Sequence, residues 1–157
     1  VPSPKVPSYE EKPEMSAAEI TERLIPEIRR GVYDFILVNY ANGDLVGHSA
    51  NLQAGVEACE AVDRCVGRVV EAGMGEDYVV MVTGDHGNIE TMFYPDGMPN
   101  PSHGLNPVPF ILISDNPELC CVKLRDGLGL SSVAPTILNL MGLEKPVEMT
   151  GESFLIG

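Results

Sequence analysis

The stretch YDFILVNYANGDLVGH (residues 33–48) decides the fold that the sequence predicts. Its first half, residues 33–40, is a short apolar run rich in β-branched and aromatic residues. Such a run predicts a strand that is buried on both faces of a covered parallel sheet. The turn residues ANGD follow the run and are expected to end the strand. Asp44 and His48 therefore come directly after the carboxyl end of this predicted strand.

Two more buried strands are predicted further along, in YVVMVT (78–83) and VPFILIS (108–114). Between the first two strands, residues of about 51–72 have a helical period, and residues 91–106 predict a loop with prolines and glycines. The helical stripe consists of Leu52, Val56, Cys59, Val62, Val66 and Val69.

Two further helices are expected near the ends of the chain. Ser16 and Glu19 form a capping-box pattern that predicts a helix start, and Pro26 is expected to kink this helix or end it early. SSVAPTILNLMG predicts a last helix, with Gly142 just past its end. This order of elements predicts the α/β class, with a doubly wound, mostly parallel sheet.

Composition limits the function classes. The chain has 157 residues, enough for one domain, and a formal charge of −13, which disfavours binding to nucleic acid and to anionic membranes. No stretch approaches the roughly 18 apolar residues of a membrane span. The four cysteines form no C-x-x-C pair and are expected to be reduced thiols in a cytoplasmic protein.

Metal-ligand residue types gather where the strands end. The second strand is followed by Asp85 and His86 in GDHGN, and the loop before the third strand carries His103 in PSHG. Together with Asp44 and His48, these residues include all three histidines of the chain. Ligands of open α/β sheets bind at the carboxyl ends of strands, and imidazole with carboxylate suits manganese or zinc. The five residues therefore predict a divalent metal site.

Each of these segments alone has a simpler interpretation: a hydrogen-bonded turn for NGDLVGH, a helix cap for GDHGN and a loop histidine for PSHG. Other catalytic classes are disfavoured, because the sequence contains neither G-x-S-x-G nor a glycine-rich loop that ends in Gly-Lys-Ser/Thr.

The chain resembles the C-terminal part of the cofactor-independent phosphoglycerate mutase family, in the alkaline phosphatase superfamily. The matching strings are VPSPKVPSYEEKPEMSA, YDFILVNYANGDLVGHSAN, AVDRCVGRVVEA, VTGDHGNIE, PSHGLNPVPFILIS and VAPTILNLMGLEKPVEMTG, which cover nearly the whole chain. The resemblance implies a three-layer α/β/α, alkaline-phosphatase-like fold that is incomplete at its N-terminal side. Residues 1–157 are then expected to be the C-terminal portion of the metal-binding domain, without the N-terminal segment and the inserted transferase domain.

The resemblance also implies roles for the site residues. Asp44, His48 and His103 match the ligands of one metal, and Asp85 and His86 match ligands of a second. Both ions are expected to be divalent, with Mn²⁺ preferred over Zn²⁺, Mg²⁺ or Co²⁺. The reaction implied is the isomerisation of 3-phosphoglycerate to 2-phosphoglycerate through a phosphoserine. The nucleophilic serine is not expected in this chain, which is therefore predicted to be inactive alone.

The resemblance further implies a glycolytic enzyme that is a cytoplasmic monomer, with phosphoglycerate as its substrate and no nucleic acid or membrane partner. Alternatives remain open: a phosphopentomutase or phosphatase of the same superfamily, or a non-catalytic metal-binding module. The strings SPKV and NPVPF favour the mutase over the first two.

Overall fold

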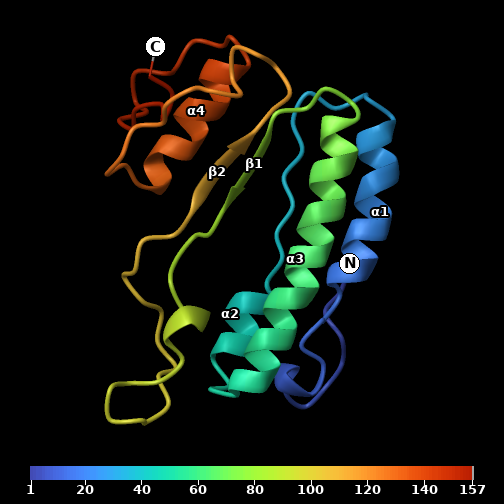
Figure 1. The fold of residues 1–157 in the computed structure, drawn as a ribbon, viewed down its shortest axis with the longest axis vertical. Coiled ribbons are helices and arrows are strands. Elements are labelled where there is room, and N and C mark those ends of the chain that lie inside the picture. Colours follow the sequence, from blue (N-terminus) through green and yellow to red (C-terminus); the bar gives the residue numbers. More distant parts are fainter. Residues whose placement is uncertain (157) are drawn as a thin grey trace. The chain divides into compact units, whose positions relative to one another are not determined.

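A computed structural model describes residues 1–156, which divide into two compact units, Val1–Ser114 and a second unit from Asp115 onward (Figure 1). The first unit contains η1 (Tyr9–Glu11), α1 (Ala17–Arg29), α2 (Asn42–Gly47), α3 (Leu52–Met74), β1 (Val80–Thr83), η2 (Ile89–Thr91) and β2 (Phe110–Ile113). The second unit contains η3 (Leu130–Ser132) and α4 (Val133–Leu140). Among residues 1–156, no helix has the length and apolar character needed to cross a membrane.

The described sheet has two strands, and they are antiparallel. Val80 of β1 lies opposite Ile113 of β2, and Thr83 lies opposite Phe110. The strands predicted from YVVMVT and VPFILIS are confirmed, but parallel pairing is wrong for these two. A parallel pair needs a crossover, usually a helix that packs on the sheet, whereas this long connection holds only the short η2 and folds back. The predicted burial of the two strands is also wrong, because every residue of β1 and β2 is at least partly exposed and Ile111 is 47% exposed. The α/β class is confirmed.

The strand predicted over residues 33–40 does not form in the described part of the chain. This segment descends from α1 to α2 in Figure 1 without pairing in the sheet. Its burial on both faces is also wrong, because Leu37 is 82% exposed and Phe35 is 49% exposed. One end is anchored, since the Tyr78 hydroxyl donates to the Tyr33 carbonyl at 2.6 Å. A strand is defined by its hydrogen-bonded neighbour, which a local sequence pattern cannot supply.

Helix α1 is confirmed, but two of its details differ from the prediction. Ser16 occupies the N-cap position, yet its hydroxyl donates to the Pro2 carbonyl at 2.8 Å, so the capping box does not form. An early end at Pro26 is wrong, since α1 continues to Arg29, whereas the alternative of a kink at Pro26 stays a prediction. Pro26 lies on the exposed side, where the Glu22 carbonyl that loses its helical partner can face solvent.

Helix α3 is confirmed and extends slightly beyond its predicted end. Its N-cap is Asn51, whose side chain accepts a hydrogen bond from the Ala54 amide. The predicted apolar stripe is only partly buried, because Leu52 and Val56 are 64% and 45% exposed. Small residues line the buried face instead: Ala54, Gly55, Ala58, Ala61, Cys65, Ala72 and Gly73. They permit α1 and α2 to approach α3 closely.

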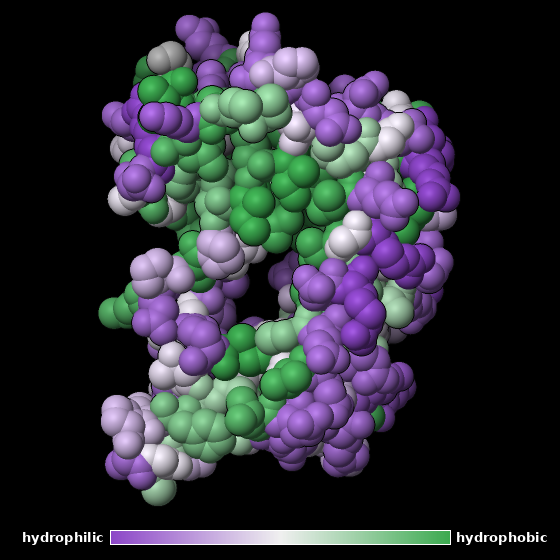
Figure 2. Space-filling view, in the orientation of Figure 1, coloured by the Kyte–Doolittle hydropathy of each residue, from purple (hydrophilic) through white to green (hydrophobic). Residues whose placement is uncertain are grey.

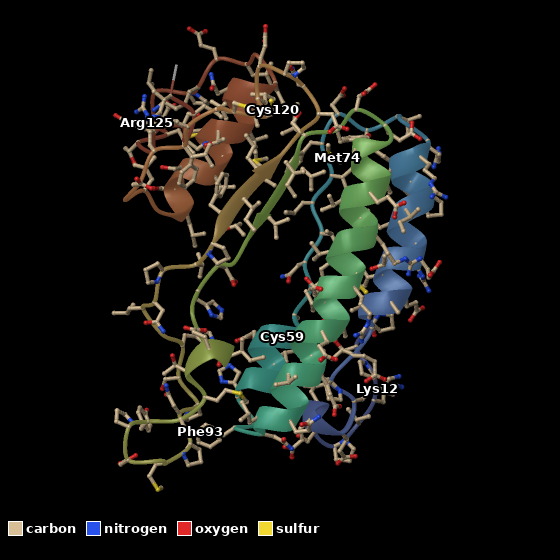
Figure 3. All side chains as sticks on the ribbon, in the orientation of Figure 1. Lys12, Cys59, Met74, Phe93, Cys120 and Arg125 are labelled. Carbon is tan, nitrogen blue, oxygen red and sulfur yellow. The ribbon has the colours of Figure 1, made fainter. Side chains whose placement is uncertain are left out.

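The four cysteines are free, as predicted. Cys65 is buried, whereas Cys59 lies on another, exposed face of α3 (Figure 3). Cys120 and Cys121 are exposed neighbours whose sulfur atoms lie 3.5 Å apart.

The second unit confirms the predicted C-terminal helix. Helix α4 ends before Gly142, which adopts a φ of +67°, a left-handed conformation that favours glycine. The Thr136 hydroxyl is fully buried, donates to the Ser132 carbonyl and accepts from the Phe154 amide. These bonds hold the C-terminal segment against α4.

Candidate metal centre

Helix α2 presents two of the predicted site residues on one face. The sequence predicted only a turn at ANGD, but the chain forms a short helix there, with His48 at its C-cap. Asp44 and His48 are four positions apart, so their side chains lie on the same side of the helix. Val46 points to the opposite side, is 0% exposed and packs with Met15 and Ala58. This packing fixes the rotation of α2 and therefore the direction of both site residues.

Three donor atoms converge at this face. Oδ1 of Asp44 lies 3.1 Å from Nε2 of His48 and 3.0 Å from Nε2 of His103. The two imidazole nitrogens lie 3.2 Å apart. Ligand bonds of about 2.0–2.2 Å place neighbouring donors roughly 3.0–3.4 Å apart. The triangle therefore fits the coordination of one divalent ion.

His48 is oriented by the backbone of the neighbouring loop. Its Nδ1 lies 2.7 Å from the carbonyl oxygen of Pro101, to which the ring N–H donates. A neutral imidazole that donates from Nδ1 keeps its lone pair on Nε2, the atom that faces Asp44 and His103. Metal-binding histidines commonly have such a carbonyl partner.

The residues predicted for a second metal occupy different positions. His86 is stacked on His103 with ring centroids 3.7 Å apart, and its Nε2 lies 3.9 Å from Oδ1 of Asp44. Ligand atoms of Asp44, His86 and His103 all lie within 4.8 Å of one another. Asp85 is at the rim, with its side chain 77% exposed and its Oδ2 3.6 Å from Nε2 of His86. The structure thus gathers all five residues, while their division between two ions stays a prediction.

Asn88 also belongs to the site, although it was not among the predicted site residues. The residue is 4% exposed, and its Nδ2 donates to Oδ1 of Asp44 at 2.9 Å and to the Asp44 carbonyl at 3.2 Å. The signal in the sequence was its position in GDHGN, two residues after His86.

A second set of contacts joins the GDHGN turn to the loop that carries His103. The Gly104 amide donates to the Gly87 carbonyl at 2.6 Å. Glu90 accepts from the Asn88 amide at 2.8 Å and from the Asn106 side chain at 2.8 Å. A Cβ atom at Gly87 would collide with Oε1 of Glu90, so any other residue there would displace the Glu90 side chain. The Glu90 brace, as we call these hydrogen bonds of Glu90, therefore sets His86 and His103 side by side.

Two carboxylates, those of Asp44 and Glu90, have a lowered pKa. Burial raises the pKa of Asp44, but the hydrogen bond from Asn88 and the nearby imidazoles outweigh it, so the pKa lies below its ordinary value. The hydrogen bond from Asn106 lowers the pKa of Glu90, and the Asn88 amide lowers it further. A charged Asp44 beside three imidazoles is the donor chemistry that borderline divalent ions prefer.

Comparison with known proteins identifies the class of this centre. The chain matches the Metalloenzyme superfamily over residues 1–145 and belongs to that family. It has an alkaline-phosphatase-like metalloenzyme fold, represented here by the α/β part described above.

The similar proteins have names that are more specific than the superfamily. The chain is 48% identical over 153 residues to a 2,3-bisphosphoglycerate-independent phosphoglycerate mutase of Flavobacterium johnsoniae, with 98% of this chain and 29% of the relative covered. A protein of the same name from Desulforudis audaxviator is 50% identical over 155 residues, with 99% of this chain and 30% of the relative covered. The chain thus spans about 30% of the length of these relatives.

A solved structure shows the same fold. It is a Leishmania mexicana phosphoglycerate mutase crystallised at low cobalt concentration, with a TM-score of 0.87 and 34% identity. The match covers 99% of this chain and 31% of that one. Family membership and this neighbour support the binding of divalent metal ions by the chain.

Proposed function

We propose that this chain supplies metal-binding residues of a 2,3-bisphosphoglycerate-independent phosphoglycerate mutase. The enzyme is an isomerase that interconverts 3-phosphoglycerate and 2-phosphoglycerate through a phosphoserine intermediate. The observation that carries the proposal is the triangle of donor atoms from Asp44, His48 and His103, with sides of 3.0–3.2 Å. The names of the relatives supply the reaction.

The proposed ligand sets follow the positions of the side chains. Asp44, His48 and His103 would hold one ion, and Asp85 and His86 would contribute to a second. Bound divalent ions activate a hydroxyl nucleophile and offset charge in phosphoryl transfer. The chain's own residues present the donors: α2 aims Asp44, the Pro101 carbonyl orients His48, and the Glu90 brace holds the loop of His103. We propose Mn²⁺ as the preferred ion.

The same proposal extends to the protein's setting. We place the intact enzyme in glycolysis, as a cytoplasmic monomer with phosphoglycerate as its substrate. Four free cysteines agree with a reducing compartment. A formal charge of −13 disfavours nucleic acid and anionic membranes as partners.

The proposal is tested on the intact protein that contains this chain. Mn²⁺ binding is measured by titration calorimetry, and activity is assayed in parallel on 3-phosphoglycerate, a ribose phosphate and a generic phosphate ester. We expect Mn²⁺ binding and turnover of 3-phosphoglycerate. Preference for the ribose phosphate indicates a phosphopentomutase, and preference for the ester indicates a phosphatase. Metal binding without activity on any of the three indicates a non-catalytic module, and no metal binding at all overturns the metal site.

A further inference from the structure

Asn88 has the contacts of a residue that orients a metal ligand. Its side-chain nitrogen donates to both Oδ1 and the backbone carbonyl of Asp44. The same nitrogen lies 3.4 Å from Nε2 of His48. Oδ1 of Asp44 is the atom that also faces His48 and His103, so Asn88 contacts the shared corner of the donor triangle.

The orientation of the Asn88 side chain is determined by its surroundings. If the amide were turned over, its oxygen would face the carboxylate and carbonyl oxygens of Asp44, which can only accept hydrogen bonds. The nitrogen therefore faces Asp44, and Oδ1 of Asn88 is left buried without a hydrogen-bond partner among residues 1–156. Buried polar atoms are rarely left in this state, and the exceptions gather at functional sites.

Helix α2, which carries Asp44, also contacts the rest of the Asn88 amide group through Gly47. A Cβ atom at Gly47 would lie 2.6 Å from Oδ1 of Asn88 and 3.0 Å from its Cγ. The backbone of Asn88 is fixed as well, because its amide donates to Glu90 at 2.8 Å. The side chain thus packs closely against Gly47 while its nitrogen bonds to Asp44.

We propose that Asn88 is a positioning residue for the metal centre, which holds Oδ1 of Asp44 in the orientation that binds the ion. This inference rests on the proposed function, since it presumes that Asp44, His48 and His103 bind a divalent ion. Outer partners of metal ligands typically contribute 10–100-fold to metal affinity. Asn88 would raise metal affinity by its hydrogen bond to Asp44, and the absence of a side chain at Gly47 leaves room for Asn88 to make this bond.

The first test replaces Asn88 and, as a control, a buried polar residue away from the site. Asn88→Ala removes the donor to Asp44, whereas Thr21→Ala removes a fully buried hydroxyl of α1 that donates to the Ala17 carbonyl. Mn²⁺ affinity is measured by calorimetry on the intact protein, well below the melting temperature of each variant. We expect Asn88→Ala to weaken binding about 10–100-fold and Thr21→Ala to change it by less than about 3-fold. Equal losses in both variants, or no loss in Asn88→Ala, would overturn the proposal.

The second test keeps Asn88, so it remains informative if Asn88→Ala fails to fold. Gly47→Ala adds a methyl group against the Asn88 side chain, and Gly43→Ala, in the same helix, adds one whose nearest neighbour is Ile89 at 3.9 Å. Alanine has a higher helix propensity than glycine at both positions, so Gly43→Ala measures the effect of propensity without the contact to Asn88. We expect weaker Mn²⁺ binding in Gly47→Ala alone, and equal binding in the two variants would contradict the positioning role. If the unsubstituted protein binds no Mn²⁺, the proposed function fails instead.

Discussion

At the scale of single residues, Oδ1 of Asp44 is the centre of the site. It receives a hydrogen bond from Asn88 and lies 3.0–3.1 Å from two imidazole nitrogens. We expect Asp44→Asn to reduce Mn²⁺ affinity at least about 100-fold, since a ligand should matter no less than its outer partners. Titration calorimetry measures the effect. Asp63→Asn, at an exposed position of α3, is the control and should leave binding unchanged.

Glu90 predicts a dependence of stability on pH. Its pKa is lowered in the folded protein, so the unfolded chain binds protons more readily as the pH falls. The stabilisation is complete above the ordinary glutamate pKa of about 4.3 and is lost as the pH falls through the lower, folded value. In thermal scans between pH 6 and 3, the drop in melting temperature should be roughly 1–3 °C smaller for Glu90→Gln than for the unsubstituted protein.

The control for this pH effect is Glu76→Gln, which changes an exposed carboxylate just after α3. Glu76→Gln should show the same drop in melting temperature between pH 6 and 3 as the unsubstituted protein. Identical profiles for Glu90→Gln and the unsubstituted protein would show that the Glu90 brace adds no stability.

At the scale of elements, helix α2 depends on a single buried anchor. Val46 is 0% exposed and faces α3 and Met15. Val46→Ala should lower the free energy of unfolding by about 1–3 kcal/mol, because it leaves a cavity behind the helix that carries Asp44 and His48. Denaturant unfolding measures the loss. Val32→Ala, at a position that is 59% exposed, should stay within about 0.5 kcal/mol.

Local sequence patterns were a reliable guide to the helices and to two strands. Periodicity predicted α3, the capping-box pattern predicted α1, the stretch before Gly142 predicted α4, and the apolar runs predicted β1 and β2. Residues 33–40 carry the same kind of run, but a strand also needs a paired neighbour. For α3 the spacing predicted a helix but not its buried face, because the close contact with α1 and α2 selects alanines over Leu52 and Val56.

The residue types predicted the metal ligands of the site, but they did not predict the residues that support these ligands. Three histidines and two aspartates at the ends of predicted strands indicated a metal centre, and the structure brings them together. Asn88 and Glu90 could not be selected in advance, because asparagine and glutamate are common surface residues. Only the distances to Asp44 and Asn106 show what these two residues do.

At the scale of the whole molecule, the donor count predicts unequal binding of two ions by this chain. Three of the predicted ligands lie at mutual distances of 3.0–3.2 Å, whereas Asp85 is largely exposed. We expect the isolated chain to bind one Mn²⁺ moderately and a second poorly, without turnover of 3-phosphoglycerate. Calorimetry and a mutase assay measure both properties, and two tight sites or measurable turnover would contradict the prediction.

The first unit also displays apolar side chains to solvent. Leu37, Val32 and Phe35 are 82%, 59% and 49% exposed, and Figure 2 shows a hydrophobic surface in the region of β1 and α3. Exposed apolar patches promote association. Leu37→Lys should reduce the binding of a hydrophobic dye and the tendency to aggregate, with less than about 0.5 kcal/mol change in stability. Lys5→Arg, which keeps the charge of an exposed residue, is the control.

His48 and His103 meet although they lie 55 positions apart in the chain. An ion held by both would act as a covalent-like cross-link that closes the intervening segment into a ring and restricts the unfolded chain. The ring contains α3, β1 and Gly87 of the Gly87–Gly104 bridge. A chelator should therefore increase proteolytic cleavage throughout this segment, including at positions far from the atoms that bind the ion.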